Sequence, residues 1–373
     1  MAVSKYRRFA AKLLNLAGVT INGSQPYDIQ VYEENFYRRV FSQGSLGLGE
    51  SYMDGWWDVP ALDEFFYRIL RARLDRHIRK YPALILQTAL ARLFNRQSSR
   101  RAFIIGKRHY DTGNELFQCM LDSGMNYSCG YWKNASGLEE AQQAKLDLIC
   151  RKIALKAGMK VLDIGCGWGG FAKFAAEKYQ VEVTGITVSQ EQAALARERC
   201  RGLPIQIRLQ DYRSLQEKFD RVVSVGMFEH VGYKNYRRFM EVVRRCLKTG
   251  GLFLLHTIGS NQSVRSTDPW IEKYIFPNSM LPSVEQIGKA INRLFVMEDW
   301  HNFGPDYDKT LLAWYQNFNR NWPKIRRNYD ERFYRMWKYF LLSCAGSFRA
   351  RANQLWQIVL SEEGIVGGVP AIR

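Results

Sequence analysis

The sequence predicts an α/β fold with a doubly wound, mostly parallel sheet and helices on both of its faces. From residue 144 onward, apolar segments of strand length alternate with segments of helix length, and this alternation is typical of parallel sheets. A glycine-rich turn follows the first of these strands, at the position where such sheets bind ligands. A smaller, mainly helical region is expected to precede the sheet.

The individual elements follow from the spacing of the apolar residues. Seven segments are expected to form the strands, and they lie at residues 159–165, 181–188, 205–211, 219–226, 250–258, 294–303 and 355–361. Helices are expected at residues 144–158, 171–179, 190–200 and 236–247, and near residues 308–345. The first of these helices should end at Gly158, because glycine is favoured just after a helix.

The region before the sheet has helical rather than alternating spacing. Residues 5–17 are a candidate for a small amphipathic helix, and such helices pack against neighbours more often than they anchor a membrane. We expect an N-terminal domain at residues 1–95, a basic linker at residues 96–110 and the α/β domain at residues 111–373.

The charge of the chain points to an anionic partner. Lys and Arg number 54 against 36 Asp and Glu, so the formal net charge is +18. Between Arg68 and Arg108 the one acid is Asp75 among twelve basic residues. A solvated helix face is the plain interpretation of that stretch. The better interpretation is that the stretch binds an anionic surface. Its interleaved apolar residues suit a membrane interface at least as well as nucleic acid.

Several classes of protein are excluded by composition. Hydrophobic residues make up 46% of the chain, which argues against disorder. The seven cysteines are widely spaced without a C-x-x-C pattern, so neither a disulfide framework nor a thiolate zinc site is expected. The five histidines lack metal-binding spacing, so no metal is expected. Without a recognisable signal peptide or an apolar run of spanning length, a cytoplasmic location is the default.

Two ligand-binding patterns fit the glycine-rich turn. Gly165, Gly167 and Gly170 match the G-x-G-x-x-G of dinucleotide-binding loops. Asp163, together with Gly165, Gly167 and Gly169, also matches the acidic-x-G-x-G-x-G loop of S-adenosylmethionine-dependent methyltransferases. Asp163 favours the second pattern, because a carboxylate can hold an ammonium group and would repel a pyrophosphate. A nicotinamide-dependent oxidoreductase stays the alternative.

Polar residues at later strand ends support the same interpretation. Asp211 follows the third strand, where it is placed to accept a hydrogen bond from an adenine amino group. The second strand ends at Thr187, where a ribose-binding acid is usual, so a weaker hydroxyl contact is expected there. Glu229 follows the fourth strand, and His256 lies near the end of the fifth. Because the carboxyl ends of parallel strands face the ligand crevice, these two residues are candidates for a base or an anion-handling pair.

Nucleic-acid amino-methyltransferases usually carry a proline-proline-aromatic turn after the fourth strand. This sequence has Met227-Phe228-Glu229-His230 there, which argues against an enzyme that modifies nucleic-acid bases. Eight other stretches are distinctive, at residues 44–57, 126–132, 161–170, 223–232, 253–260, 268–278, 296–308 and 345–351. In these stretches, and over nearly the whole chain, the sequence resembles the cyclopropane and mycolic acid synthase family of S-adenosylmethionine-dependent methyltransferases.

The resemblance implies a Rossmann-like class I methyltransferase fold with a smaller, mainly helical N-terminal domain that engages lipid. It also implies an enzyme that adds a methylene group across a cis double bond in phospholipid acyl chains. In this family a bound bicarbonate ion is proposed to accept the proton that must leave before the ring closes. The matching positions are Cys129, Glu229, His256, the backbone at Ile258, and Tyr307. Cys344, in a helical stretch, is a further candidate nucleophile, although the mechanism needs no covalent intermediate and core packing is the better explanation of this thiol.

The resemblance also implies where the cofactor and the partners bind. The cofactor positions are Tyr127, Ser128, Asp163, Gly165, Cys166, Gly167, Trp168, Gly169, Thr187, Gln192, Asp211 and Tyr212. The expected partners are a bilayer with anionic headgroups, a phospholipid acyl chain and a second copy of the chain, without nucleic acid. The expected location is the inner face of the cytoplasmic membrane. A same-fold enzyme that leaves a methyl branch, or a basic nucleic-acid-binding protein, is the alternative.

Overall fold

The computed structural model describes residues 2–74 and 114–373. These residues divide into two units. The first, here the helical unit, contains the described part of Met1–Leu116 together with Thr267–Pro277 and Trp314–Ala352. The second, here the sheet unit, contains Phe117–Ser266, Asn278–Ala313 and Asn353–Arg373. Both units are built from segments that are distant in sequence, whereas the sequence suggested one boundary, in a linker that lies outside the described residues.

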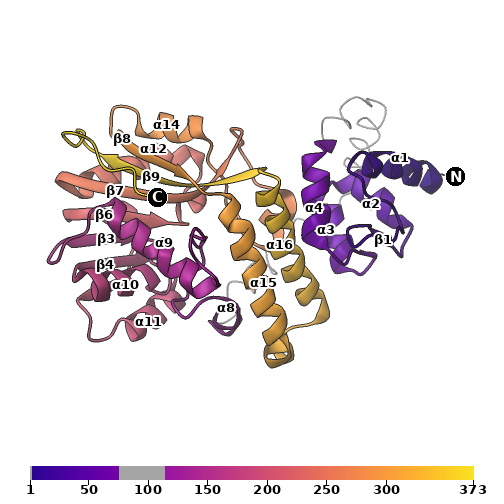
Figure 1. Cartoon of the computed structure of the whole chain (residues 1–373), viewed down its shortest axis with the longest axis horizontal. Coiled ribbons are helices and arrows are strands. Elements are labelled where there is room, and N and C mark those ends of the chain that lie inside the picture. Colours follow the sequence, from indigo (N-terminus) through magenta and orange to yellow (C-terminus); the bar gives the residue numbers. More distant parts are fainter. Residues whose placement is uncertain (1, 75–113) are drawn as a thin grey trace. The chain divides into compact units, whose positions relative to one another are not determined.

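One seven-stranded sheet forms the centre of the sheet unit (Figure 1). Its strands are β3 (Lys160–Ile164), β4 (Glu182–Thr187), β5 (Ile205–Leu209), β6 (Phe219–Val225), β7 (Leu247–Ser260), β8 (Val296–Asn302) and β9 (Asn353–Ser361). They are arranged in the order β5-β4-β3-β6-β7-β9-β8, and β9 is antiparallel to both of its neighbours. The strand order reverses between β3 and β6, which is where a doubly wound sheet opens a ligand crevice. The predicted mostly parallel sheet is confirmed.

The helices alternate with these strands. They are α9 (Leu138–Lys152), α10 (Gly170–Tyr179), α11 (Gln190–Arg199), α12 (Tyr236–Cys246) and α14 (Val284–Ile291), together with the beginning of α15 (Pro305–Ile325). Both predicted boundaries of the first helix are wrong, because α9 begins at Leu138 rather than at residue 144 and ends before Gly158. Its last turn carries Arg151 and Lys152, and Ala154 then adopts a left-handed φ of 48° that stops the helix. Basic residues are favoured at this end of a helix.

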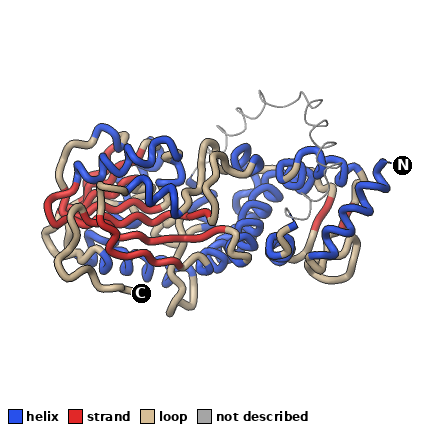
Figure 2. The backbone as a smooth tube through the Cα atoms, turned by 90° about the horizontal axis from the view of Figure 1, so that it is seen from above, coloured by secondary structure: helices blue, strands red, loops and turns tan. Residues whose placement is uncertain are grey.

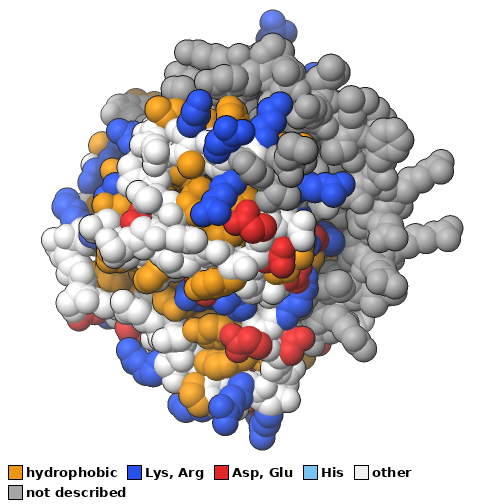
Figure 3. Space-filling model, turned by 90° about the vertical axis from the view of Figure 1, so that its right-hand side faces the viewer, with side chains coloured by type: hydrophobic (Ala, Val, Ile, Leu, Met, Phe, Trp, Pro, Cys, Tyr) orange, Lys and Arg blue, Asp and Glu red, His pale blue; other side chains and the backbone are white. Residues whose placement is uncertain are grey.

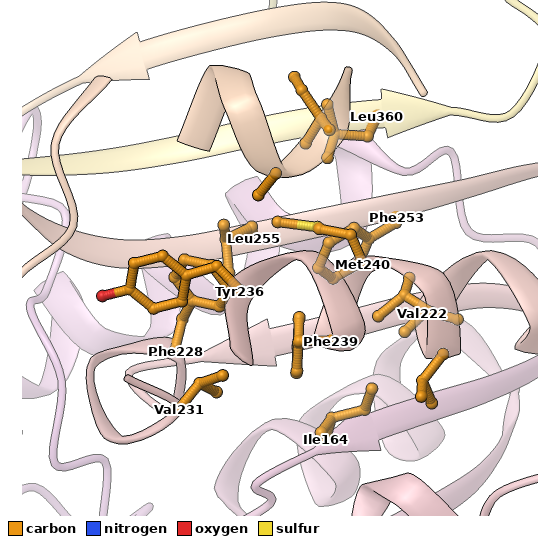
Figure 4. Packing of buried hydrophobic residues seen from close by; sticks show 14 of the residues in the cluster. Ile164, Val222, Phe228, Val231, Tyr236, Phe239, Met240, Phe253, Leu255 and Leu360 are labelled. Atoms are coloured by element: carbon orange, nitrogen blue, oxygen red, sulfur yellow. The ribbon is translucent and has the colours of Figure 1, made fainter. Parts of the chain in front are cut away.

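Helices cover both faces of the sheet (Figure 2). On one face, Phe239 and Met240 of α12 pack with Val222 of β6 and Phe253 of β7 (Figure 4). The neighbouring strand residues Val223 and Leu254 point to the other face, where they pack with α9 and α10. This alternation follows from the period of two in a β-strand, and it makes the strands apolar on both sides.

The helical unit is mainly helical, as predicted. Its elements are α1 (Ala2–Leu16), α2 (Asn35–Gln43), α3 (Ser45–Met53), α4 (Leu62–Arg71), α13 (Pro269–Tyr274), α16 (Glu331–Arg349) and a short ribbon of β1 (Gln30–Val31) with β2 (Trp57–Asp58). The fully buried side chains of Trp57, Tyr52 and Trp270 lie in its core. Close packing of α16 on α4 requires Gly346, since a Cβ there would come within 2.4 Å of the Asp63 carbonyl oxygen.

The basic stretch between Arg68 and Arg108 falls mostly outside the described residues. Only its beginning, through residue 74, is described, at the end of α4 and just beyond it. The predicted amphipathic helix at residues 5–17 is part of α1. None of the described helices combines the length and the apolar character that crossing a bilayer requires.

Candidate active site

The glycine loop joins β3 to α10 and presents open backbone. Gly165 and Gly167 have φ angles of 85° and 53°, which favour glycine. A Cβ at Gly165 would come within 2.7 Å of the Cβ of Met227, whereas one at Gly167 would meet no described atom within 4 Å. The amides of Gly165 and Cys166 donate to the Ile186 carbonyl at 2.9 and 3.0 Å, so these two hold the loop itself. The N-terminus of α10, to which the loop leads, suits a ligand group that brings negative charge.

Asp163 lies on β3 directly before this loop. Its side chain is 2% exposed, and Oδ2 finds no hydrogen-bond partner among the described residues. Burial raises the pKa of Asp163 to about 7, while the nearby charge of Lys145 opposes that rise. A buried carboxylate oxygen is rarely left unpaired. An ammonium group from a ligand would satisfy it, as the sequence predicted.

The segment before α9 closes against this loop. Ser128 accepts a hydrogen bond at Oγ from Lys145 Nζ (3.0 Å), and its carbonyl accepts one from Gln142 Nε2 (2.7 Å). The Phe117 ring contacts both the Tyr127 and Trp168 rings, at centroid distances of 5.1 and 4.9 Å. The structure therefore brings Tyr127 and Ser128 to the glycine loop.

The remaining predicted cofactor positions extend along neighbouring strand ends. Thr187, at the end of β4, donates from Oγ1 to Oε1 of Gln192 (2.9 Å). Asp211, after β5, is paired with Arg213 at 2.6 Å, and the hydrogen bond from that guanidinium lowers the pKa of the carboxyl. Tyr212 packs its ring against Phe239.

Cys166 contributes differently from the other loop residues. Its side chain is buried in a small core cluster with Ala196 of α11 and Ile207 of β5. Burial raises the pKa of its thiol. Its backbone N–H donates to the Ile186 carbonyl at 3.0 Å, so both the thiol and the amide of Cys166 are engaged within the protein.

Glu229 is held at the end of β6 in a short 3-10 helix, Phe228–His230. Its side chain is 5% exposed. Oε1 accepts a hydrogen bond from the Ile258 backbone N–H at 2.7 Å, while no described group pairs with Oε2. Burial raises the pKa of Glu229 to about 7, against the hydrogen bond from Ile258. Near neutral pH this carboxyl therefore exchanges a proton readily.

His256 lies on the adjacent strand, β7, two residues before Ile258 on the same strand face. It is 1% exposed, and Gln357 Nε2 lies 3.3 Å from its Nδ1. Burial holds the pKa of His256 well below its usual value, so the imidazole is neutral. With Gln357 donating to Nδ1, Nε2 carries the proton. Within the described part of the chain, that Nε2–H group meets no acceptor.

The beginning of α15 carries Tyr307 and is fastened to the segment around Cys129. Thr310 Oγ1 accepts a hydrogen bond from the Gly130 backbone N–H (3.1 Å) and one from Trp132 Nε1 (2.9 Å). Cys129 is fully buried with its Sγ 3.8 Å from Thr310 Oγ1, and burial raises the pKa of the thiol well above its usual value. Cys129 and Tyr307 are thereby brought to one end of α15.

Phe303 connects this region to the histidine. Its ring centroid lies 5.8 Å from that of His256 and 5.3 Å from that of Tyr131. Cys344 is placed differently, because it lies on α16 in the helical unit. Burial raises the pKa of its thiol to about 12, so it stays protonated and is a poor nucleophile.

Two buried polar residues near the site were not singled out from the sequence. Lys145 is 1% exposed on α9, and burial lowers its pKa to about 8. Gln357 is fully buried on β9. The signal for Lys145 was its position directly before the largely apolar segment Leu146–Cys150, but a lone lysine in a helix is usually a surface residue.

The strand order and the loop after β3 define the class of protein, which is a class I S-adenosylmethionine-dependent methyltransferase. Comparison with known families is more specific. Residues 97–358 match the family model of the mycolic acid cyclopropane synthetases, and the chain belongs to this family.

Individual relatives agree with this assignment. The chain is 58% identical over 366 residues to the cyclopropane-fatty-acyl-phospholipid synthase of Escherichia coli (strain K12), covering 98% of this chain and 96% of that protein. The cyclopropane synthase MmaA2 from Mycobacterium tuberculosis matches with a TM-score of 0.65 at 30% identity, covering 70% of this chain and 98% of that one. Mycolic acid cyclopropane synthase CmaA1, in complex with SAH and CTAB, matches with a TM-score of 0.63 at 31% identity and the same coverage. The predicted family and enzyme class are confirmed.

Proposed function

We propose that the protein transfers a methylene group from S-adenosylmethionine across a cis double bond of a phospholipid acyl chain and forms a cyclopropane ring. The 58% identity to the Escherichia coli synthase supports the reaction class. One observation supports the location of the reaction. Glu229 Oε2 and His256 Nε2 are buried polar atoms at adjacent strands, and neither has a partner among the described residues. A folded protein keeps such atoms where a ligand satisfies them.

The residues around the glycine loop fit the cofactor. When bound, S-adenosylmethionine supplies an electrophilic methyl group on a cationic sulfur. Asp163 Oδ2, which has no partner among the described residues, would accept from its ammonium group, and the start of α10 would lie near its carboxylate. Thr187 and Gln192 would lie along the ribose, while Asp211 would accept from the adenine. Tyr127 closes the site over the loop.

The residues at Glu229 and His256 fit a small anion such as bicarbonate, which would supply a base. His256 Nε2–H donates to such an ion. A Glu229 carboxyl with a pKa of about 7 is protonated often enough to donate from Oε2 as well. The Ile258 N–H is already engaged by Glu229, so its role is to orient the carboxyl. Tyr307 and the buried Cys129 thiol complete the proposed anion site.

The same residues explain why the ring closes in this proposal. Methyl transfer to a double bond creates a carbocation, and closure requires that the added methyl lose a proton. Apolar and aromatic side chains such as Phe303 exclude water, which would otherwise trap the cation as an alcohol. Aromatic faces at Tyr307 and Trp132 stabilise the passing positive charge.

We also propose that the protein works at the inner face of the cytoplasmic membrane, on a bilayer with anionic headgroups, and as a homodimer. The net charge of +18 supports the choice of surface. Lys5, Arg8 and Lys12 of α1 are exposed, as is Leu16 at its end. Figure 3 shows hydrophobic side chains among Lys and Arg on the face that carries the N-terminal helices.

Product analysis tests the proposed reaction. Purified protein is incubated with methyl-labelled S-adenosylmethionine, bicarbonate and vesicles of dioleoylphosphatidylglycerol. The proposal predicts label in the lipid and upfield cyclopropane methylene protons in its NMR spectrum. Label without these protons would favour the methyl-branching alternative and would contradict ring closure. No label in lipid, with cofactor still bound, would overturn the choice of substrate.

A further inference from the structure

A cavity of about 690 Å³ opens between α12 and α14 of the sheet unit. The two helices lie side by side on one face of the sheet (Figure 1). Its walls come from the beginning of α12, the loop after β7, and α14 with the turn that follows it. We call it the α12–α14 groove. None of the residues assigned to the cofactor or the anion site lines it.

The groove is apolar at its base, and its rim carries four basic residues and one acidic residue, Glu285. Tyr236 and Ala290, which line it, are 2% and 3% exposed. The four basic residues that line it are all exposed, and they are Arg237, Arg265, Lys289 and Arg293. A ligand that fits this arrangement has an anionic group beside an apolar portion.

Two of the four cations are available for such a ligand. Lys289 is paired with Glu285 at 2.6 Å, and Arg237 lies 3.4 Å from Glu241. Arg265 and Arg293 have no carboxylate partner within residues 2–74 and 114–373. Guanidinium groups pair with phosphate through parallel hydrogen bonds, so two unpaired arginines on one rim suit a phosphodiester.

Hydrogen bonds and ring contacts connect the groove to the candidate active site. The Tyr236 ring stacks on Phe228, the residue before Glu229, at a centroid distance of 4.2 Å. Tyr236 Oη donates to the Met280 carbonyl (3.3 Å), and the Met280 N–H donates to the Glu229 carbonyl (2.8 Å). One layer of side chains therefore belongs to both the groove and the wall that holds Glu229.

The rim is also held in place. Ser263 Oγ lies 2.7 Å from Ser283 Oγ, and Gln286 Nε2 donates to the Val264 carbonyl at 3.1 Å. These bonds fix the loop that carries Arg265 against the first turn of α14. The arginine is thus presented by an ordered loop, which lowers the entropy lost when it binds a ligand.

We propose that the α12–α14 groove binds the phosphodiester headgroup of a phospholipid. The phosphate contacts Arg265 and Arg293, and the acyl carbons next to the glycerol lie against Tyr236 and Ala290. This inference rests on the proposed function, because it assigns the headgroup of the same lipid whose acyl chain is modified. Free phosphate has the same charge chemistry but lacks the apolar portion that the base of the groove fits.

The test compares two double variants that each remove two positive charges. Arg265→Gln with Arg293→Asn changes the rim, and asparagine tolerates the left-handed φ of 58° at that position. Lys156→Gln with Arg201→Gln is the matched control. Both control residues are exposed and precede strands β3 and β5, at the edge of the sheet opposite the candidate active site. Calorimetry measures binding of dihexanoylphosphatidylglycerol below its micelle concentration, and of inorganic phosphate.

The rim variant is expected to bind the short-chain lipid about tenfold more weakly, whereas the control variant binds as the wild type does. Inorganic phosphate should bind the wild type at least about tenfold more weakly than the lipid. Equal loss in both variants, no loss in either, or equal affinity for inorganic phosphate would overturn the inference. Wild-type ring formation on vesicles is scored separately, so a failure of the proposed function is distinguished from a failure of the groove.

Discussion

At the scale of single residues, the candidate site is defined by polar atoms that the fold buries and leaves unpaired. Glu229 Oε2, His256 Nε2 and Asp163 Oδ2 have this property among the described residues. Leaving such a group without a partner costs about 1–3 kcal/mol. The fold tolerates that cost at three strand ends of one edge of the sheet, which is where a doubly wound sheet binds its ligands.

The raised pKa of Glu229 predicts how its replacement affects stability. Glu229 stays protonated in the folded protein up to a pH of about 7 but ionises from about 4.5 in the unfolded chain. Wild-type stability therefore falls as pH rises through this window. Glu229→Gln cannot ionise, so its stability relative to wild type should rise by about 2–3 kcal/mol between pH 5 and pH 8. Urea midpoints at the two pH values measure this, and a difference independent of pH would contradict it.

Lys145 predicts a separate effect on cofactor binding. Its ammonium group donates to Ser128 Oγ and lies near the Asp163 carboxylate. Lys145→Met should release the segment at Ser128 and weaken S-adenosylmethionine binding about tenfold, because a charge-assisted hydrogen bond is lost. Calorimetry measures the dissociation constant. Lys156→Met, at an exposed position, is the control and should bind normally. Equal affinity in the two variants would remove Lys145 from the site.

The sequence could predict residues whose role depends on a strand end, but not those whose role depends on a distant partner. Asp163 and His256 lie near the ends of apolar strands and Glu229 follows one, so all three were recognisable. Lys145 acts through Ser128, and Gln357 through His256, a residue 101 positions away. No local pattern records such a pair, because it exists only after the strands are placed side by side.

At the scale of elements, the attachment of α15 organises one wall of the site. Thr310 Oγ1 accepts from Gly130 and Trp132 and donates to the Asp306 carbonyl at 3.0 Å. One hydroxyl thus joins the segment of Cys129 to the turn of Tyr307. This contact cannot be predicted from the motif at residues 126–132 alone or from the motif at residues 296–308 alone.

Thr310→Val tests that attachment. Valine keeps the shape of threonine but leaves two buried donors without an acceptor, so the free energy of unfolding should fall by about 2 kcal/mol. Urea denaturation followed by tryptophan fluorescence measures the loss. Thr249→Val, at an exposed position, is the matched control. A loss no larger than that of the control would mean that Thr310 does not hold the two segments together.

Strand and helix types were predicted well, whereas the two boundaries of α9 were not. Periodicity predicts an element where one face is buried, as in β6 and α12. The end of α9 was misplaced because Gly158 looked like a stop, although the chain turns earlier, at Ala154. A left-handed alanine has no reliable sequence signal.

At the scale of the whole molecule, the units are assembled from distant segments. In the helical unit, Arg349 of α16 pairs with Asp63 at 2.7 Å and with Glu64 at 3.2 Å. These partners are 286 and 285 residues apart. Composition does not show that a late segment of the chain packs in the same unit as an early one. For this reason the sequence suggested a single boundary between domains.

The net charge of +18 predicts that the proposed association with a membrane depends on salt. Binding to vesicles of dioleoylphosphatidylglycerol should weaken at least about tenfold between 50 and 300 mM salt, because counterions screen exposed charges. Co-sedimentation with vesicles measures this. Vesicles of dioleoylphosphatidylcholine, which carry no net charge, are the control and should bind weakly at both salt concentrations. Binding that ignores salt and headgroup charge would contradict an electrostatic docking surface.

The central claim is that Glu229 and His256 take part in removing the proton before ring closure. The most direct measurement is kcat for ring formation by Glu229→Gln and His256→Ala. The dissociation constant of S-adenosylmethionine is measured on the same samples. Glu198→Gln, at an exposed position, is the control. We predict that kcat falls at least about 100-fold while the dissociation constant changes less than about threefold. A kcat equal to that of the control would contradict the claim.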